Sequence, residues 1–189
     1  MPLSGYFMAI DRVEKRLCRV ASALDAAKIA YAVVGGNAVA AWVARADPSA
    51  TRASKDVDLL VRRIDLPAIT ATLTAIGLTR EDLRGLVLFV DPEEPSRKAG
   101  VYLVWAGEKV RPSYEVPAPD VAEAERDPEG FAVLGLGALV RMKLTSFRDI
   151  DRVHIADMRS VGLITYAVRA GLPEALRARL DSVEAEEDQ

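Results

Sequence analysis

The chain has 189 residues, half of them apolar, with a formal net charge of −3 and one cysteine. This size predicts one compact domain, or one domain with a helical appendage, and the acidic balance argues against a surface made for broad nucleic-acid binding. Cys18 cannot form an internal disulfide, and its helical surroundings predict a packed thiol. No run of eighteen apolar residues and no signal-peptide pattern occurs, so we expect a cytoplasmic protein with no membrane partner.

Two glycines interrupt the first half of the chain at a place where the apolar pattern changes. Residues 7–27 repeat apolar side chains every three or four positions, which predicts an amphipathic helix. A strand-like run then begins at Tyr31, breaks at Gly35 and Gly36, and resumes as an alanine-rich helical pattern over residues 37–46. Such glycines are typical of a plain strand-to-helix turn. They also permit a phosphate site, because glycine lets a ligand approach the main chain and free N–H groups at a helix start attract anions.

Asp56 and Asp58 lie two residues apart in the next predicted strand. Their side chains would project from one face at a spacing of about 6.6 Å, while the apolar residues between and after them face the core. Two unpaired carboxylates raise the pKa of one another, and a divalent cation reverses that penalty. Mg²⁺ commonly takes one or two carboxylates together with substrate phosphates. The alternative is a solvated strand edge that carries two acids by chance.

These motifs resemble a known superfamily. Gly35-Gly36-Asn37, followed by Thr-Arg-Ala-Ser-Lys-Asp-Val-Asp-Leu-Leu-Val at residues 51–61, resembles the nucleotidyltransferases of the DNA polymerase β type. Within that superfamily the chain is most similar to the bacterial minor nucleotidyltransferases and the AbiEii-like toxins of toxin–antitoxin systems. The gap between Gly36 and Asp56 is longer than is usual there.

The resemblance implies an α/β (α+β) fold with a mixed β-sheet flanked by helices. We expect a core over residues 1–119 and a C-terminal helical region over residues 120–189. The implied reaction moves a nucleoside monophosphate from a nucleoside triphosphate to a hydroxyl of an RNA end, a protein or a small molecule. Asp56 and Asp58 would be catalytic and bind Mg²⁺ or Mn²⁺, and a toxin would also have an antitoxin protein as partner. The expected nucleotide-binding residues are Gly35, Gly36, Asn37, Arg52, Lys55 and Lys143. Arg52 and Lys55 have a simpler explanation as charges that offset the two acids.

A third carboxylate is not where the resemblance places it. Residues 86–90 and 101–106 predict an antiparallel pair of strands, and in the resembled superfamily the third acid lies on the second of them. Here residues 101–105 read Val-Tyr-Leu-Val-Trp. Glu108 lies too far along that strand, and the other candidates need a loop that folds back: Asp91, Glu93 and Glu94. Two-metal phosphoryl transfer uses a third ligand and a base, so a single-metal enzyme or a catalytically impaired nucleotide-binding or interaction protein stays open.

The C-terminal region carries a second polar group of residues. Apolar spacing predicts a helix from Leu136, a helix after residue 149, and a last helix over residues 173–183 that ends in a solvated, frayed acidic tail. If the first two helices formed one unbroken helix, Lys143, Ile150, His154 and Asp157 would fall within about 60° of arc.

The stretch from residue 143 to residue 157 resembles the lysine and arginine-to-aspartate motifs of AbiEii-like proteins. By that similarity Lys143 would touch the triphosphate and Asp157 would support the site, with His154 as a further supporting residue. The alternative is an exposed helix face with ion pairs such as Arg148 with Asp151.

Overall fold

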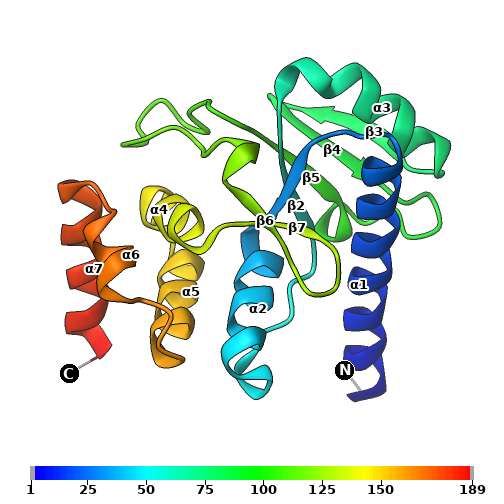
Figure 1. The fold of residues 1–189 in the computed structure, drawn as a ribbon. Coiled ribbons are helices and arrows are strands. Elements are labelled where there is room, and N and C mark those ends of the chain that lie inside the picture. Colours follow the sequence, from blue (N-terminus) through cyan, green and yellow to red (C-terminus); the bar gives the residue numbers. More distant parts are fainter. Residues whose placement is uncertain (1–2, 188–189) are drawn as a thin grey trace.

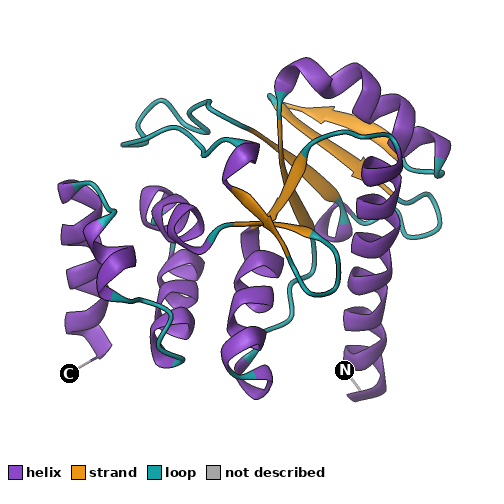
Figure 2. Cartoon of the chain, in the orientation of Figure 1, coloured by secondary structure: helices purple, strands orange, loops and turns teal. Residues whose placement is uncertain are grey.

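A seven-stranded mixed sheet forms the centre of the molecule (Figure 2). The computed structural model describes the backbone of residues 3–187 and the burial of side chains 11–186. The strands are β1 (Tyr31–Val34), β2 (Val57–Val61), β3 (Thr79–Leu83), β4 (Leu86–Val90), β5 (Val101–Trp105), β6 (Ala124–Arg126) and β7 (Ala132–Leu134). Their order across the sheet is β3-β4-β5-β2-β1-β7-β6.

Helices flank this sheet, as the sequence predicts for the α/β class. The α-helices of the described chain are α1 (Leu3–Ala26), α2 (Gly35–Ala46), α3 (Leu66–Ala75), α4 (Leu136–Ser146), α5 (Asp149–Ser160), α6 (Tyr166–Ala170) and α7 (Glu174–Glu187). Figure 1 shows α4 to α7 grouped on one side of the molecule and α1 and α3 on the other, with α2 between them. No helix in residues 3–187 is long and apolar enough to cross a membrane.

The central strands are apolar because both of their faces are covered. All four residues of β1 are buried, and β2 buries every residue except Asp58, which is half-buried. β1 runs antiparallel to β2 and parallel to β7, while β2 runs parallel to β5. This register places Asp58 opposite Val34 on one side and opposite Tyr102 on the other.

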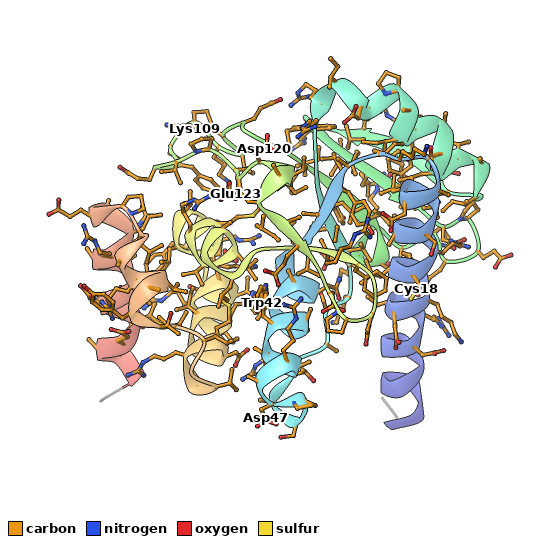
Figure 3. All side chains as sticks on the ribbon, viewed as in Figure 1. Cys18, Trp42, Asp47, Lys109, Asp120 and Glu123 are labelled. Carbon is orange, nitrogen blue, oxygen red and sulfur yellow. The ribbon has the colours of Figure 1, made fainter. Side chains whose placement is uncertain are left out.

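The helices pack through the apolar side chains whose spacing is seen in the sequence. On α1 the side chains of Val13, Val20 and Leu24 are buried, whereas Cys18 is exposed on the same helix (Figure 3). The prediction of a packed thiol is therefore wrong, because Cys18 lies on the outward face of α1. Trp42 ties α2 to the end of β7, since its Nε1 donates a hydrogen bond of 3.0 Å to the carbonyl oxygen of Leu134.

Three strands lie outside the predicted elements. β3 is a polar edge strand that pairs with β4, so it lacks a buried alternating pattern. β6 and β7 have three residues each and extend the sheet beyond β1. Both follow residue 119, so the region expected to be helical from residue 120 contains two strands, and its α-helices begin only at Leu136. The division into two domains stays a prediction.

The two helices predicted from Leu136 and after residue 149 are present as α4 and α5. They do not form one unbroken helix, because Phe147 adopts a left-handed conformation with φ 48° and ends α4, so the common arc considered for Lys143, Ile150, His154 and Asp157 does not apply. The acidic tail is not simply solvated: Glu184 forms an ion pair with Arg169, and Glu186 forms one with Arg152. The side chains of residues 187 and 188, which were also assigned to that tail, lie outside the described part.

Candidate active site

Asp58 lies directly against Gly35, at the point where β1 turns into α2. Gly35 has φ +66°, and a Cβ at this position would lie 2.0 Å from Oδ2 of Asp58. Only glycine combines this left-handed backbone with the absence of a side chain. The antiparallel register of β1 and β2 delivers the Asp58 carboxylate to the first residue of α2. The turn is thus shaped around a carboxylate.

Asp56 is fixed beside it by residues of α2 and of the preceding loop. Nδ2 of Asn37 donates to the backbone oxygen of Asp56 at 2.7 Å, and Oγ of Ser54 donates to Oδ1 of Asp56 at 3.1 Å. A Cβ on Gly36 would lie 2.8 Å from Oγ of Ser54. The structure therefore brings the two predicted aspartates and the two predicted glycines together at the N-terminus of α2, where free backbone N–H groups favour an anion.

Asp58 lies in an environment that disfavours its charge. Burial, followed by the negative charge of Asp56, raises the pKa of this carboxyl to about 6, while Lys143 and Arg148 act in the opposite direction. A divalent cation would relieve this repulsion, so the carboxylate pair fits Mg²⁺ or Mn²⁺. Among the described residues no cluster of three or more His, Cys, Asp and Glu could hold a metal, so phosphate oxygens of a nucleotide would have to complete the ligands of such an ion.

Lys143 and Arg148 are held near Asp58 by one buried carboxylate. Asp151 is fully buried and accepts hydrogen bonds from Nζ of Lys143 at 3.0 Å, from Oγ of Ser146 at 2.7 Å and from Nε of Arg148 at 2.7 Å. The backbone N–H of Arg148 also donates to it. These donors, led by the hydrogen bond from Arg148, lower the pKa of Asp151 to about 2 against the opposing effect of its burial. The expected ion pair of Arg148 with Asp151 is present and Arg148 is exposed, but the carboxylate of Asp151 is fully buried and is shared with Lys143.

The turn at Phe147 brings the start of α5 back toward α2. His154 approaches the glycine turn, since its Cε1 would lie 3.8 Å from a Cβ on Gly36. Its Nδ1 is buried and has no hydrogen-bond partner among the described residues. Burial, followed by the positive charge of Lys143, lowers the pKa of His154 to about 4. His154 is therefore a neutral imidazole at neutral pH, with one unused nitrogen.

An ion pair holds the loop before β2 next to α5. Nε of Arg52 donates to Oδ2 of Asp157 at 2.7 Å, which links the loop before β2 to α5. Both residues were predicted at the site, Arg52 for the nucleotide and Asp157 as support. Lys55 is exposed next to Asp56.

Three of the acids considered as a third ligand point elsewhere. Asp91 forms an ion pair with Arg19, and Glu94 forms one with Arg16, both on α1. Glu108 forms two hydrogen bonds with Arg63 near the opposite end of β5. A loop that folds an acid back to the aspartates is therefore not seen for Asp91 and Glu94. The position on β5 opposite Asp58 is taken by Tyr102.

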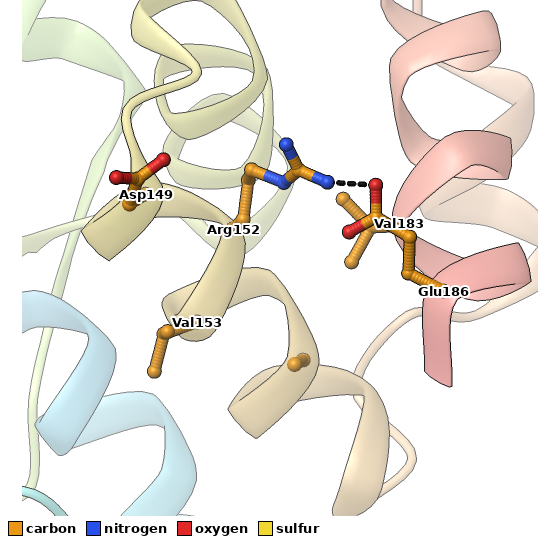
Figure 4. A pocket seen from close by; sticks show the side chains of 6 residues that line it. Asp149, Arg152, Val153, Val183 and Glu186 are labelled. Carbon is orange, nitrogen blue, oxygen red and sulfur yellow. Dashed lines mark ion pairs between the residues drawn. The ribbon is translucent and has the colours of Figure 1, made fainter. Parts of the chain in front are cut away.

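Two surface pockets lie away from the aspartates. One, of about 270 Å³, lies between α5 and α7, where the ion pair of Arg152 with Glu186 crosses it (Figure 4). The other, of about 190 Å³, lies beside Trp105 and Glu108. The candidate site is instead the polar surface between β2, the glycine turn and the start of α5.

Four residues of this site were not among the predicted functional residues. In the sequence, Ser54 is marked only by its position two residues before Asp56. Tyr102 is marked only by its place on the strand where a third acid was expected. The burial of Asp151 and the position of Arg148 depend on the left-handed turn between α4 and α5. The nucleotide-binding and supporting roles assigned to Asn37, Arg52, Lys55, Lys143, His154 and Asp157 stay predictions.

No model of a known protein family matches this chain, and no curated protein matches it in sequence. Solved structures do match. The solution structure of the antibiotic-resistance factor ANT(2'')-Ia has a TM-score of 0.59 at 19% identity, covering 94% of this chain and 95% of that one. The crystal structure of ANT(2'')-Ia in complex with adenylyl-2''-tobramycin has a TM-score of 0.57 at 15% identity, covering 94% and 99%.

An antigenic nucleotidyltransferase-like protein from Paracoccidioides brasiliensis has a TM-score of 0.54 at 18% identity, covering 94% of this chain and 89% of that one. At such low identities the similarity concerns the fold. The resemblance to the AbiEii-like proteins stays a prediction. The chain has the fold shared by ANT(2'')-Ia and this nucleotidyltransferase-like protein, as the sequence predicts.

Proposed function

We propose that this chain transfers a nucleoside monophosphate from a nucleoside triphosphate to a hydroxyl acceptor. The observation that carries the proposal is the position of the Asp58 carboxylate directly against Gly35, with Asp56 beside it at the start of α2. The nucleotidyltransferase-like fold supports the same reaction.

Some groups of the site bind the triphosphate, and others offset its negative charge. Backbone N–H groups at the start of α2 bind phosphate oxygens, because they have no partner within the helix. Lys143 and Arg148 offset the charge that collects when a triphosphate lies near Asp58. When bound, Mg²⁺ or Mn²⁺ held by Asp56 and Asp58 supplies charge neutralisation at the transferred phosphate. The acceptor oxygen attacks the α-phosphorus in line as pyrophosphate leaves.

Three further residues orient these groups. Asn37 and Ser54 hold Asp56 by its backbone oxygen and its carboxylate. Arg52 holds the loop to α5 through Asp157, and the exposed Lys55 adds positive charge at the entrance for the triphosphate.

The test is transfer of label from α-labelled nucleoside triphosphates with Mg²⁺ or Mn²⁺. RNA, cell extract and hydroxyl-bearing small molecules serve as acceptors. Wild type should label one of them, and Asp56→Ala should reduce the rate by at least about a hundredfold, because it removes an electrostatic contact made in the transition state. Asp82→Asn is the matched control, since Asp82 is an exposed carboxylate of the same sheet that pairs with Arg80. Equal loss in both variants would contradict the proposed role of Asp56.

The acceptor and the biological role are further parts of the proposal. The complex of ANT(2'')-Ia with adenylyl-2''-tobramycin favours a small-molecule acceptor over RNA. The AbiEii-like resemblance favours a toxin with an antitoxin partner. Growth arrest on expression, abolished by Asp56→Ala and relieved by a protein encoded next to this one, would support the toxin role. Normal growth at high expression would remove it.

A second candidate is a nucleotide-binding protein that has lost catalysis. The observation that favours it is Tyr102, which stands opposite Asp58 where an acid was expected. This candidate predicts that nucleotides raise the melting temperature, because a ligand that binds only the folded state stabilises it. It also predicts that no label reaches any acceptor.

A further inference from the structure

Tyr102 shares a face of the sheet with the two aspartates. β2 and β5 are parallel neighbours, and Tyr102 lies directly opposite Asp58 in their register. Side chains that lie opposite one another in adjacent strands project from the same face, with the strands about 4.8 Å apart. The tyrosine side chain on this shared face is longer than that of aspartate.

The hydroxyl of Tyr102 leans toward the end of the sheet where Asp56 lies. It donates a hydrogen bond of 2.7 Å to the carbonyl oxygen of Arg97, just before β5. The same end of β5 accepts a hydrogen bond from Val57, the neighbour of Asp56, through the carbonyl oxygen of Gly100. The charges of Asp56 and Asp58 both act on the phenol, and with burial they raise the pKa of Tyr102. The phenol is thus near both acids and is only half-buried.

We propose that Tyr102 is an acceptor within the chain itself, and that the protein transfers a nucleoside monophosphate to its phenolic oxygen. This inference rests on the proposed function. The phenolic oxygen forms a bond to the α-phosphorus of a nucleoside triphosphate. The bond between that phosphorus and the oxygen bridging to the β-phosphorus breaks, pyrophosphate leaves, and the phenolic proton passes to solvent. The product is a phosphodiester on Tyr102.

Two other described tyrosines are placed differently. Tyr31 is buried in β1 and donates to Asp25. Tyr166 lies on α6 with 87% of its surface exposed. Tyr102 is the one placed opposite Asp58. A nucleotidyl group on Tyr102 would also add negative charge next to two carboxylates, so modification should slow transfer to other acceptors.

The experiment is intact-mass measurement of the full chain after incubation with each nucleoside triphosphate and Mg²⁺ or Mn²⁺. Wild type should gain one nucleoside monophosphate per chain, mapped by peptide sequencing to Tyr102 and removed by a phosphodiesterase. Tyr102→Phe keeps the ring but lacks the attacking oxygen, and it should show at least a tenfold loss of modified chain. Tyr166→Phe is the matched control and should be modified like wild type. Asp58→Asn should block the modification.

The experiment distinguishes failure of the self-modification from failure of the proposed function. An unmodified wild-type chain that still labels an external acceptor overturns the self-modification alone. A modified Tyr102→Phe chain overturns it as well, because another residue must then carry the group. A wild-type chain that labels neither itself nor any acceptor overturns both proposals. Melting temperatures of the variants show whether they are folded, and Tyr102→Phe should stay close to wild type because only one hydrogen bond to Arg97 is lost.

Discussion

Gly35 and Asp58 determine the shape of the candidate site together, because the carboxylate occupies the space that a side chain at position 35 would fill. A Cβ on Gly35 would lie 2.0 Å from Oδ2, 2.8 Å from Cγ and 2.9 Å from Cβ of Asp58. Such distances are far inside van der Waals contact, and Asp58 is held on a central strand. The aspartate can escape a side chain at position 35 only by leaving its rotamer.

Gly35→Ala should therefore damage both stability and transfer. The positive φ costs alanine about 1–2 kcal/mol, and overpacking adds about 1–3 kcal/mol. Gly107→Ala separates the two effects, because Gly107 has φ +72° and nothing within 4 Å of its Cβ position. Urea unfolding should show the larger loss for Gly35→Ala. Similar losses in the two variants would mean that Asp58 does not press on Gly35.

The fold around Gly35 could be predicted because its signals are local. An apolar run, two glycines and an alanine-rich repeat mark β1, the turn and α2, and the spacing of Asp56 and Asp58 places both acids next to that turn. The long segment between Gly36 and Asp56 does not move the two acids away from the turn, because side-chain contacts hold the loop before β2 in place.

The parts that could not be predicted depend on distant contacts. β6 and β7 have three residues each and take their place from pairing next to β1. β3 is polar because it lies at the sheet edge. A left-handed phenylalanine is uncommon, and no residue pattern announces that Phe147 turns the chain. Without that turn Asp151 would lie on a helix surface, so the burial of its carboxylate was missed.

Two partly buried groups should give the unfolding free energy opposite slopes with pH. In the absence of a divalent cation the pKa of Asp58 is raised to about 6. Between pH 4 and 6 the folded chain keeps a proton on Asp58 that the unfolded chain has lost, so stability falls as pH rises, by up to about 3 kcal/mol. The pKa of His154 is lowered to about 4, so the unfolded chain holds the extra proton there and stability rises with pH up to about 6.5.

Single variants should reveal each slope. Asp58→Asn removes the falling contribution, so relative to wild type its unfolding free energy should increase as pH rises from 4 to 6. His154→Gln removes the rising contribution and should show the reverse difference. Chemical denaturation at a series of pH values with a chelator present measures both. If the difference between Asp58→Asn and wild type is the same at every pH, the carboxyl of Asp58 titrates normally.

Asp151 should matter more for stability than Lys143, although they form one ion pair. Asp151→Ala leaves the buried ammonium of Lys143 without this partner, which typically costs about 3–5 kcal/mol. Lys143→Met leaves Asp151 with Ser146 and Arg148 as donors, so its cost should be lower by at least about 1 kcal/mol. Urea denaturation at pH 7 compares the two variants. A larger loss for Lys143→Met would show that the donors from Ser146 and Arg148 do not sustain the buried charge.

Tyr102→Asp should turn the carboxylate pair into a three-carboxylate site. An aspartate at this position faces Asp58 from the neighbouring strand, so without metal the added negative charge should lower the melting temperature. With Mg²⁺ or Mn²⁺ the same charge becomes a ligand, and the rise in melting temperature on adding the cation should exceed that of wild type. A chelator should abolish the difference. Tyr102→Asn is the control of equal size, and it should show a smaller response to the cation because it lacks the charge. Equal responses of the two variants would mean that β5 does not present residue 102 to the ion, and the geometry argued for Tyr102 would then be wrong.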